Sequence, residues 1–181
     1  MNPIKQLQHF LEAVLDKIEL MSHDEYTVAA YFRKKGTKIG ANCRILIKGF
    51  GSEPYLIRIG DHCTIAPDVV FITHDASAGL FRDEIPDLNV FGKIDIKDNC
   101  FIGHGAKILY NVTIGPNSIV GAGSVVTKDV PPNTVAAGVP ARIITGTNDF
   151  KHKCIAQWKE LGITGERSTW EKQLRAHFWP Q

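Results

Sequence analysis

Residues 96–126 read IKDNCFIGHGAKILYNVTIGPNSIVGAGSVV, and every sixth residue from Ile96 to Val126 is aliphatic. The same step continues toward the N-terminus with two interruptions. All eleven positions on this step are apolar, although the chain is 44% hydrophobic, and random placement would give this roughly once in ten thousand trials. The positions are Ile39, Ile45, Ile59, Ile65, Phe71, Ile96, Ile102, Ile108, Ile114, Val120 and Val126.

A six-residue period is typical of a parallel β-helix, in which each repeat buries its apolar face only by stacking on its neighbours. Each repeat would form one short strand and a corner, and three repeats would close a triangular coil. The residue after the apolar position is often Gly or Ala, which we expect at a tight turn. Neither a helical nor a two-residue period is sustained. Accidental spacing in a β-sandwich is the alternative.

Helical patterns flank the repeats on both sides. Residues 1–36 are predicted to form a helical cap, with an apolar stripe in residues 3–21 and a second helix that opens at Ser22 and Glu25 and closes at Gly36. The β-helix is predicted over residues 37–146. Residues 147–181 are predicted to form a helical extension whose second helix opens at Ser168 and Glu171.

A break in the period marks a loop that leaves the coils. Phe71 and Ile96 are separated by four repeats plus one residue, so residues 76–93 are predicted to be an excursion from one corner. Loops of this length inside a compact domain are usually functional.

Composition excludes several classes of protein. The chain has 181 residues, a net charge of +2 and a pI near 8.3, which does not suggest nucleic-acid or membrane binding. No apolar run is long enough for a membrane span, and the N-terminus lacks a signal-peptide pattern, so a cytoplasmic location is expected. The cysteines form no CxxC pair, so no metal site is predicted.

A longer motif carries a family resemblance. Residues 114–144 read IGPNSIVGAGSVVTKDVPPNTVAAGVPARII, which resembles the last coils of the hexapeptide-repeat acyltransferases, in the branch of the maltose and galactoside O-acetyltransferases and xenobiotic acetyltransferases. The resemblance implies a left-handed β-helix, acetyl-CoA or another acyl-CoA as donor, and a homotrimer with active sites between subunits. It also implies one catalytic His at or before the excursion, where ITHDAS places His74.

The chemistry proposed for His74 can be argued without the resemblance. A neutral imidazole takes a proton near neutral pH, which a hydroxyl must lose as it attacks a thioester. A carboxylate on the other ring nitrogen would fix the tautomer. Asp75 is adjacent but points to the opposite face of an extended chain, so Asp83, Glu84 and Asp87 are equally good candidates.

The remaining site residues are predicted on two grounds. The excursion is expected to set the acceptor, with Asp75, Arg82 and Asn89 as contacts. For the CoA side, the resemblance implies the pantetheine end near His104, backbone contacts at the coil glycines, and cations toward the phosphates, because a guanidinium binds phosphate through two N–H groups. The CoA-side residues are His104, Gly121, Ala122, Thr127, Lys128 and Arg142. Galactoside enzymes carry a second Arg where this chain has Thr145.

The main functional prediction is an acetyl-CoA-dependent transferase acting on a sugar hydroxyl. Transfer to the amine of an amino sugar is an alternative within that class. A metal-dependent hydratase of the γ-carbonic-anhydrase type shares this coil, but it needs two His ligands five residues apart, and no pair in the coils has that spacing. A non-catalytic β-helix scaffold is the third alternative.

Overall fold

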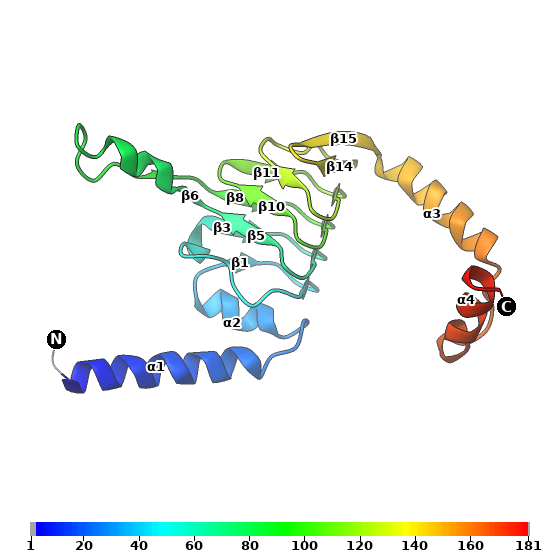
Figure 1. Cartoon of the computed structure of the whole chain (residues 1–181), viewed down its shortest axis with the longest axis horizontal. Coiled ribbons are helices and arrows are strands. Elements are labelled where there is room, and N and C mark those ends of the chain that lie inside the picture. Colours follow the sequence, from blue (N-terminus) through cyan, green and yellow to red (C-terminus); the bar gives the residue numbers. More distant parts are fainter. Residues whose placement is uncertain (1–2, 181) are drawn as a thin grey trace.

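The structure, a computed structural model, describes residues 3–180. Three sheets form the sides of a coil (Figure 1), and along most of the coil the chain visits them in rotation, so that three successive strands complete one turn. Sheet A contains β1 (Lys38–Ile39), β3 (Ile57–Ile59), β8 (Ile94–Ile96) and β11 (Val112–Ile114). Sheet B contains β2 (Arg44–Ile45), β4 (Thr64–Ile65), β9 (Phe101–Ile102), β12 (Ile119–Val120), β14 (Thr134–Gly138) and β15 (Ala141–Gly146). Sheet C contains β5 (Val70–Ile72), β10 (Lys107–Leu109) and β13 (Val125–Val126).

The strand register confirms the six-residue period. Ile59 pairs with Ile96 on sheet A, and Ile65 pairs with Ile102 on sheet B, so equivalent repeat positions stack along the coil axis. All eleven predicted apolar positions are buried, with exposed fractions of 8% or less. The parallel coils and their core were therefore predicted from the sequence.

Where a glycine follows the apolar position, its role differs from the expected one. An added Cβ at Gly60 would lie 2.8 Å from the backbone nitrogen of Asp98, and one at Gly103 would lie 2.6 Å from the backbone nitrogen of Ala122. The next coil leaves no room for a side chain there. The tight turn comes two residues later, where positive φ angles occur at Asn42, His62, Asp68, Asn99, Gly105, Asn111, Asn117, Gly123 and Asn133. Asn, Asp and His are enriched among non-glycine residues with positive φ.

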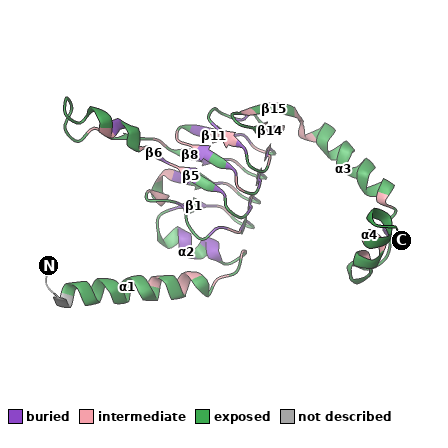
Figure 2. Ribbon diagram, in the orientation of Figure 1, coloured by how far each residue is buried: buried purple, intermediate pink, exposed green. Residues whose placement is uncertain are grey.

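Two N-terminal helices precede the coils. α1 (Pro3–Met21) contacts α2 (Val28–Lys34), and α2 contacts β1 and β2. Phe32 of α2 meets Phe50 edge to face at 4.5 Å, and Phe50 stacks on Phe71 of sheet C at 5.2 Å. α2 therefore covers the first coil, while the apolar stripe of α1 is exposed (Figure 2).

The predicted starts of two short helices are wrong. α2 begins at Val28 because the carboxylate of Asp24 accepts hydrogen bonds from the backbone of Tyr26 and Thr27, which forms a turn after the Ser22 position. Ser22 instead donates to the carbonyl of Glu19. At the other end of the chain, Ser168 lies in a 3-10 turn, η3 (Arg167–Thr169), and the helix follows it.

The C-terminal helices extend away from the coils. β15 runs antiparallel to β14, and α3 (Thr147–Leu161) continues outward from it to α4 (Trp170–Phe178) (Figure 1). Trp158 and Trp170 pack against each other with ring centres 5.1 Å apart. In the part of the chain that the structure describes, the helices are too short or too polar to cross a membrane.

The excursion is an arm. It leaves sheet C after Ile72, returns at Ile94, and projects from the coils between those points (Figure 1). Its base is an antiparallel pair, β6 (His74–Asp75) with β7 (Val90–Phe91), followed outward by the 3-10 helix η2 (Ala76–Phe81). A second 3-10 helix, η1 (Pro54–Leu56), lies in the irregular segment before β3.

Candidate active site

The base of the arm places His74 beside a carboxylate. His74 begins β6, and its Nδ1 lies 2.9 Å from Oε2 of Glu53. Glu53 precedes η1 in the loop that leads to β3, while His74 lies in the arm that leads to β8, the neighbouring strand of sheet A. The His74 side chain is 42% exposed and that of Glu53 is 12% exposed. The imidazole is therefore accessible, and the carboxylate behind it is shielded.

Glu53 is held ionised by its hydrogen bonds. Its Oε2 also accepts a hydrogen bond from Oγ1 of Thr73 at 2.6 Å, and Thr73 is buried. The bond from Thr73, followed by the bond from His74, holds the pKa of the Glu53 carboxyl below its usual range. A carboxylate only accepts hydrogen bonds, so Nδ1 of His74 must carry a proton. In the neutral ring with its proton on Nδ1, Nε2 is the nitrogen that can accept a proton from a substrate.

Sequence reasoning missed Glu53. It considered only carboxylates adjacent to His74 or in the arm, and Glu53 lies 21 residues earlier. One coil separates the two positions, and stacked coils bring equivalent loops side by side. That relation could have identified Glu53, because it is the acidic residue of the other interruption in the repeat.

Asp75 makes different contacts from His74. Its carboxylate accepts from the backbone N–H of Ser77 at 3.0 Å and from its hydroxyl at 2.6 Å, and the hydroxyl of Tyr110 lies 3.3 Å away. The bonds from Ser77 lower the pKa of Asp75. Asp75 thus caps η2 and connects the arm to the third coil.

Two other predicted acceptor residues shape the arm itself. Arg82 donates through Nε to the carbonyl of Leu88 at 3.0 Å, and through a terminal nitrogen to Oδ1 of Asn89 at 2.8 Å. These bonds close the turn at the outer end of the arm. Phe91 of β7 faces His74 across the base, with ring centres 6.2 Å apart.

The residues predicted for CoA lie at two corners of the coil: His104, Gly121 and Ala122 between sheets B and C, and Thr127 and Lys128 between sheets C and A, the corner that carries the arm. His104 lies at the turn from sheet B to sheet C, 62% exposed, with Nε2 3.4 Å from Oδ2 of Asp68. Gly121 and Ala122 occupy the same turn one coil later, and the backbone N–H of Gly121 is bonded to Ala136. The N–H of Gly121 is therefore not free for a ligand.

Lys128 and Arg142 are brought together. Both line a cavity of about 260 Å³ between the last coil and the β14–β15 hairpin. Arg142 donates only to the carbonyl of its neighbour Ala141 among the residues described. Thr127 is exposed next to this cavity but does not line it. Two cations with free donors suit a phosphate group.

Within residues 3–180, no three His, Cys, Asp or Glu side chains are grouped in a way that could hold a metal ion. Cys43, Cys63 and Cys100 are buried in the coils and Cys154 is exposed.

Known proteins resemble this chain, and one protein family matches part of its coil. The bacterial transferase hexapeptide (six repeats) family matches residues 93–128. Protein CapG of Staphylococcus aureus is 48% identical over 126 residues, which are 68% of this chain and 73% of CapG. Galactoside O-acetyltransferase of Escherichia coli K12 is 42% identical over 114 residues, 59% of this chain and 53% of that enzyme.

A solved structure gives the same result for the fold. A hexapeptide-repeat acetyltransferase of Vibrio cholerae, determined in complex with acetyl coenzyme A, has a TM-score of 0.54 and 30% identity over 75% of this chain and 85% of its own. Such neighbours imply left-handed winding of the coils. The chain belongs to the hexapeptide-repeat transferase family, among its acetyltransferases. It spans about half of the E. coli galactoside enzyme and nearly three quarters of CapG.

Proposed function

We propose that the protein transfers the acetyl group of acetyl-CoA to a sugar hydroxyl, with His74 as the general base. The observation that carries the proposal is the hydrogen bond between His74 Nδ1 and Glu53 at 2.9 Å. With Nδ1 donating to Glu53, the neutral form of this accessible ring has its lone pair on Nε2, as proton abstraction requires. The galactoside O-acetyltransferase relative supports a sugar as the acceptor.

The reaction has two proton transfers. As the acceptor oxygen attacks the thioester carbonyl carbon, its proton passes to Nε2 of His74. The resulting imidazolium is stabilised by the Glu53 carboxylate, which keeps its own charge. The tetrahedral intermediate then collapses, the carbon–sulfur bond breaks, and the imidazolium returns the proton to the leaving thiolate. The products are the acetyl ester and free CoA.

The donor would lie along the corner between sheets B and C. His104, Gly121 and Ala122 follow this corner on successive coils, and we assign them to the pantetheine arm. Since the N–H of Gly121 is bonded within the coil, its contact would use its small size and not a hydrogen bond. Lys128 and Arg142, with Thr127 beside them, would bind the phosphates.

The assembly is part of the same proposal. We propose a homotrimer in which the arm of one subunit reaches the donor corner of the next, so that each active site is shared. The arm's exposed apolar side chains support this, with Leu80 81% and Phe81 56% exposed.

In this scheme residues 37–146 are the catalytic domain, α2 caps the first coil, and residues 147–181 extend the fold. The enzyme works in the cytoplasm.

The first test is calorimetric titration of acetyl-CoA into the protein and into His74→Ala, with His152→Ala on α3 as a matched control. We expect all three to bind acetyl-CoA. We expect His74→Ala alone to lose transfer to a panel of sugars and amino sugars, by about 100-fold or more. Failure of the unmodified protein to bind acetyl-CoA would refute the proposed function. Undiminished turnover in His74→Ala would refute the role of His74.

A further inference from the structure

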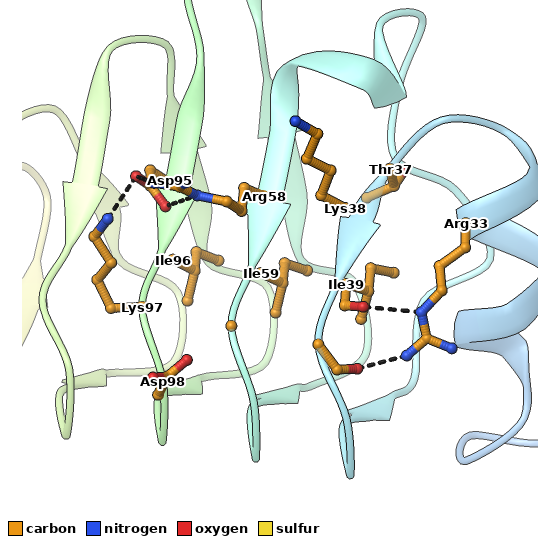
Figure 3. A pocket seen from close by; sticks show the side chains of 12 residues that line it. Arg33, Thr37, Lys38, Ile39, Arg58, Ile59, Asp95, Ile96, Lys97 and Asp98 are labelled. Carbon is orange, nitrogen blue, oxygen red and sulfur yellow. Dashed lines mark hydrogen bonds and ion pairs between the residues drawn. The ribbon is translucent and has the colours of Figure 1, made fainter.

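The outer face of sheet A carries a band of positive charge beside the arm. Two adjoining grooves lie on this face, of about 620 and 200 Å³, and they share Lys38, Arg58 and Asp95. Figure 3 shows these side chains on neighbouring strands of the larger groove. The charged residues of the two grooves are Arg33, Lys38, Arg58, Lys93, Lys97, Asp95 and Asp98. Their net charge exceeds the +2 of the whole chain.

The strand register places like charges opposite each other. Lys38 of β1 pairs with Arg58 of β3, which pairs with Asp95 of β8. Like charges directly opposite each other on a sheet are destabilising. The face therefore has an excess of positive charge at Lys38 that an anionic ligand would relieve.

The buried carboxylate is already neutralised. Asp95 is 4% exposed and accepts hydrogen bonds from Nε of Arg58 and from Nζ of Lys97, both at 2.8 Å, as well as from a terminal nitrogen of Arg58 (Figure 3). Asp98 accepts from the backbone N–H of Asp61. Among residues 3–180, neither Lys38 nor Lys93 forms an ion pair with a carboxylate. Both are exposed and available to a ligand.

The smaller groove is lined by residues that lie next to the candidate active site along the chain. Tyr55, which lines the smaller groove and is 64% exposed, lies two residues after Glu53. Lys93 lies two residues after Phe91, whose ring faces His74. A chain with one hydroxyl at His74 could therefore continue past Tyr55 and Lys93 onto Lys38 and Arg58.

We infer that the acceptor is an acidic saccharide chain, whose carboxylates bind along this basic face while one of its hydroxyls is acetylated at His74. The inference rests on the proposed function and names its substrate class. It assigns Lys38 and Lys93 to acceptor binding.

The two grooves are lined by anionic as well as cationic side chains, which favours a saccharide over a nucleic acid as the ligand. Duplex DNA carries a charge about every 1.7 Å, and such a polymer would meet the exposed carboxylate of Asp98 as well as the cations. An acidic saccharide has fewer charges, and its hydroxyls can donate to carboxylates between them. Tyr55 is the only aromatic residue among those lining the two grooves, whereas single-stranded nucleic acids are bound on several aromatic rings.

The test compares three probes without acetyl-CoA: an oligogalacturonate, a neutral malto-oligosaccharide of equal length, and an oligothymidylate of matching charge. The proteins are the unmodified chain, the double variant Lys38→Glu/Lys93→Glu, and Lys172→Glu on α4 as the control. Lys38→Glu would stand opposite Arg58, so we expect the double variant to fold, which its melting temperature would verify.

We expect the oligogalacturonate to bind, and to bind much more weakly in about 1 M salt, where the Debye length is about 3 Å. The double variant should lose tenfold or more in affinity, since two attractive contacts become repulsive, and Lys172→Glu should not. Equal binding of the neutral saccharide, stronger binding of the oligothymidylate, or full affinity in the double variant would overturn the inference.

A second readout separates this inference from the proposed function. The double variant should bind acetyl-CoA normally, and its KM for the acidic acceptor should rise at least tenfold with kcat little changed. If the oligogalacturonate binds but is never acetylated, while another sugar is, the acceptor assignment is overturned and the proposed function stands. If acetyl-CoA does not bind, the proposed function fails whatever the saccharide result.

Discussion

Replacing Glu53 with Gln tests the pair at the centre of the site. The amide oxygen of Gln can still accept hydrogen bonds from Thr73 and from Nδ1 of His74, so the ring should keep its orientation. What the variant loses is the negative charge that faces the imidazolium formed during the reaction. The change therefore isolates the electrostatic part of the interaction.

The structure sets the expected size of the effect. A hydrogen bond to a charged group contributes about 1.5–3 kcal/mol, against about 1 kcal/mol for a neutral one. The loss in the transition state is then about 0.5–2 kcal/mol, or about 2- to 30-fold in kcat. Because 42% of the His74 side chain is exposed to water, we expect the lower half of that range.

The assay is steady-state release of CoA thiol from acetyl-CoA with a saturating acceptor. We expect kcat to fall in Glu53→Gln, while the KM for acetyl-CoA stays within about twofold, because Glu53 does not line the cavity of Lys128 and Arg142. The control is Glu84→Gln, which makes the same change on the arm. A kcat within twofold of the unmodified enzyme, or an equal loss in Glu84→Gln, would refute the electrostatic role of Glu53.

Three further predictions concern the coil. An Ala at Gly103 would place its Cβ 2.6 Å from a backbone nitrogen of the next coil, so chemical denaturation should show a loss of about 2 kcal/mol or more, whereas Gly49→Ala, with open space around it, should be neutral. The pKa of Asp95 is about 2, below its ordinary value of 3.8, because of Arg58 first and then Lys97. Since the folded-state pKa is the lower one, its contribution of about 2 kcal/mol is present above pH 4 and is lost as the pH falls toward 2. Acid titrations of stability should therefore be steeper for the unmodified protein than for Asp95→Asn, and parallel curves would contradict this. Ellman's reagent should modify only Cys154 in the native protein and all four cysteines in denaturant, because Cys43, Cys63 and Cys100 are buried in the coils and Cys154 is exposed; rapid reaction of more than one native thiol would show that the coils open.

The coil was predictable because its rule is local and repeated. Each apolar position pairs with the equivalent position of the next coil, so one period in the sequence determines the register of Ile59 with Ile96 and of Ile65 with Ile102. The helix starts were less predictable, since Ser, Thr and Asp all compete for the same turn. At α2 the competing turn at Asp24 prevails.

The site was only partly predictable, because it joins residues from different coils. His74 could be selected from its own neighbourhood, but its partner depends on how two irregular loops stack, and both loops interrupt the repeat. Glu53 was therefore missed. The pairing of Lys128 with Arg142 in one cavity depends on the antiparallel turn from β14 to β15, which the six-residue period does not predict.

The arm leaves and rejoins the coils without disturbing them. β5 pairs with β10 and β3 pairs with β8 as if the residues between Ile72 and Ile94 were absent. Doubling the length of a flexible loop costs only about 0.6 kcal/mol. Evolution can therefore lengthen, shorten or exchange this arm while the scaffold and the donor side are inherited unchanged. Under the proposed function, changes in this arm would alter the acceptor specificity of the coil in a segment on whose length the stability of the core hardly depends.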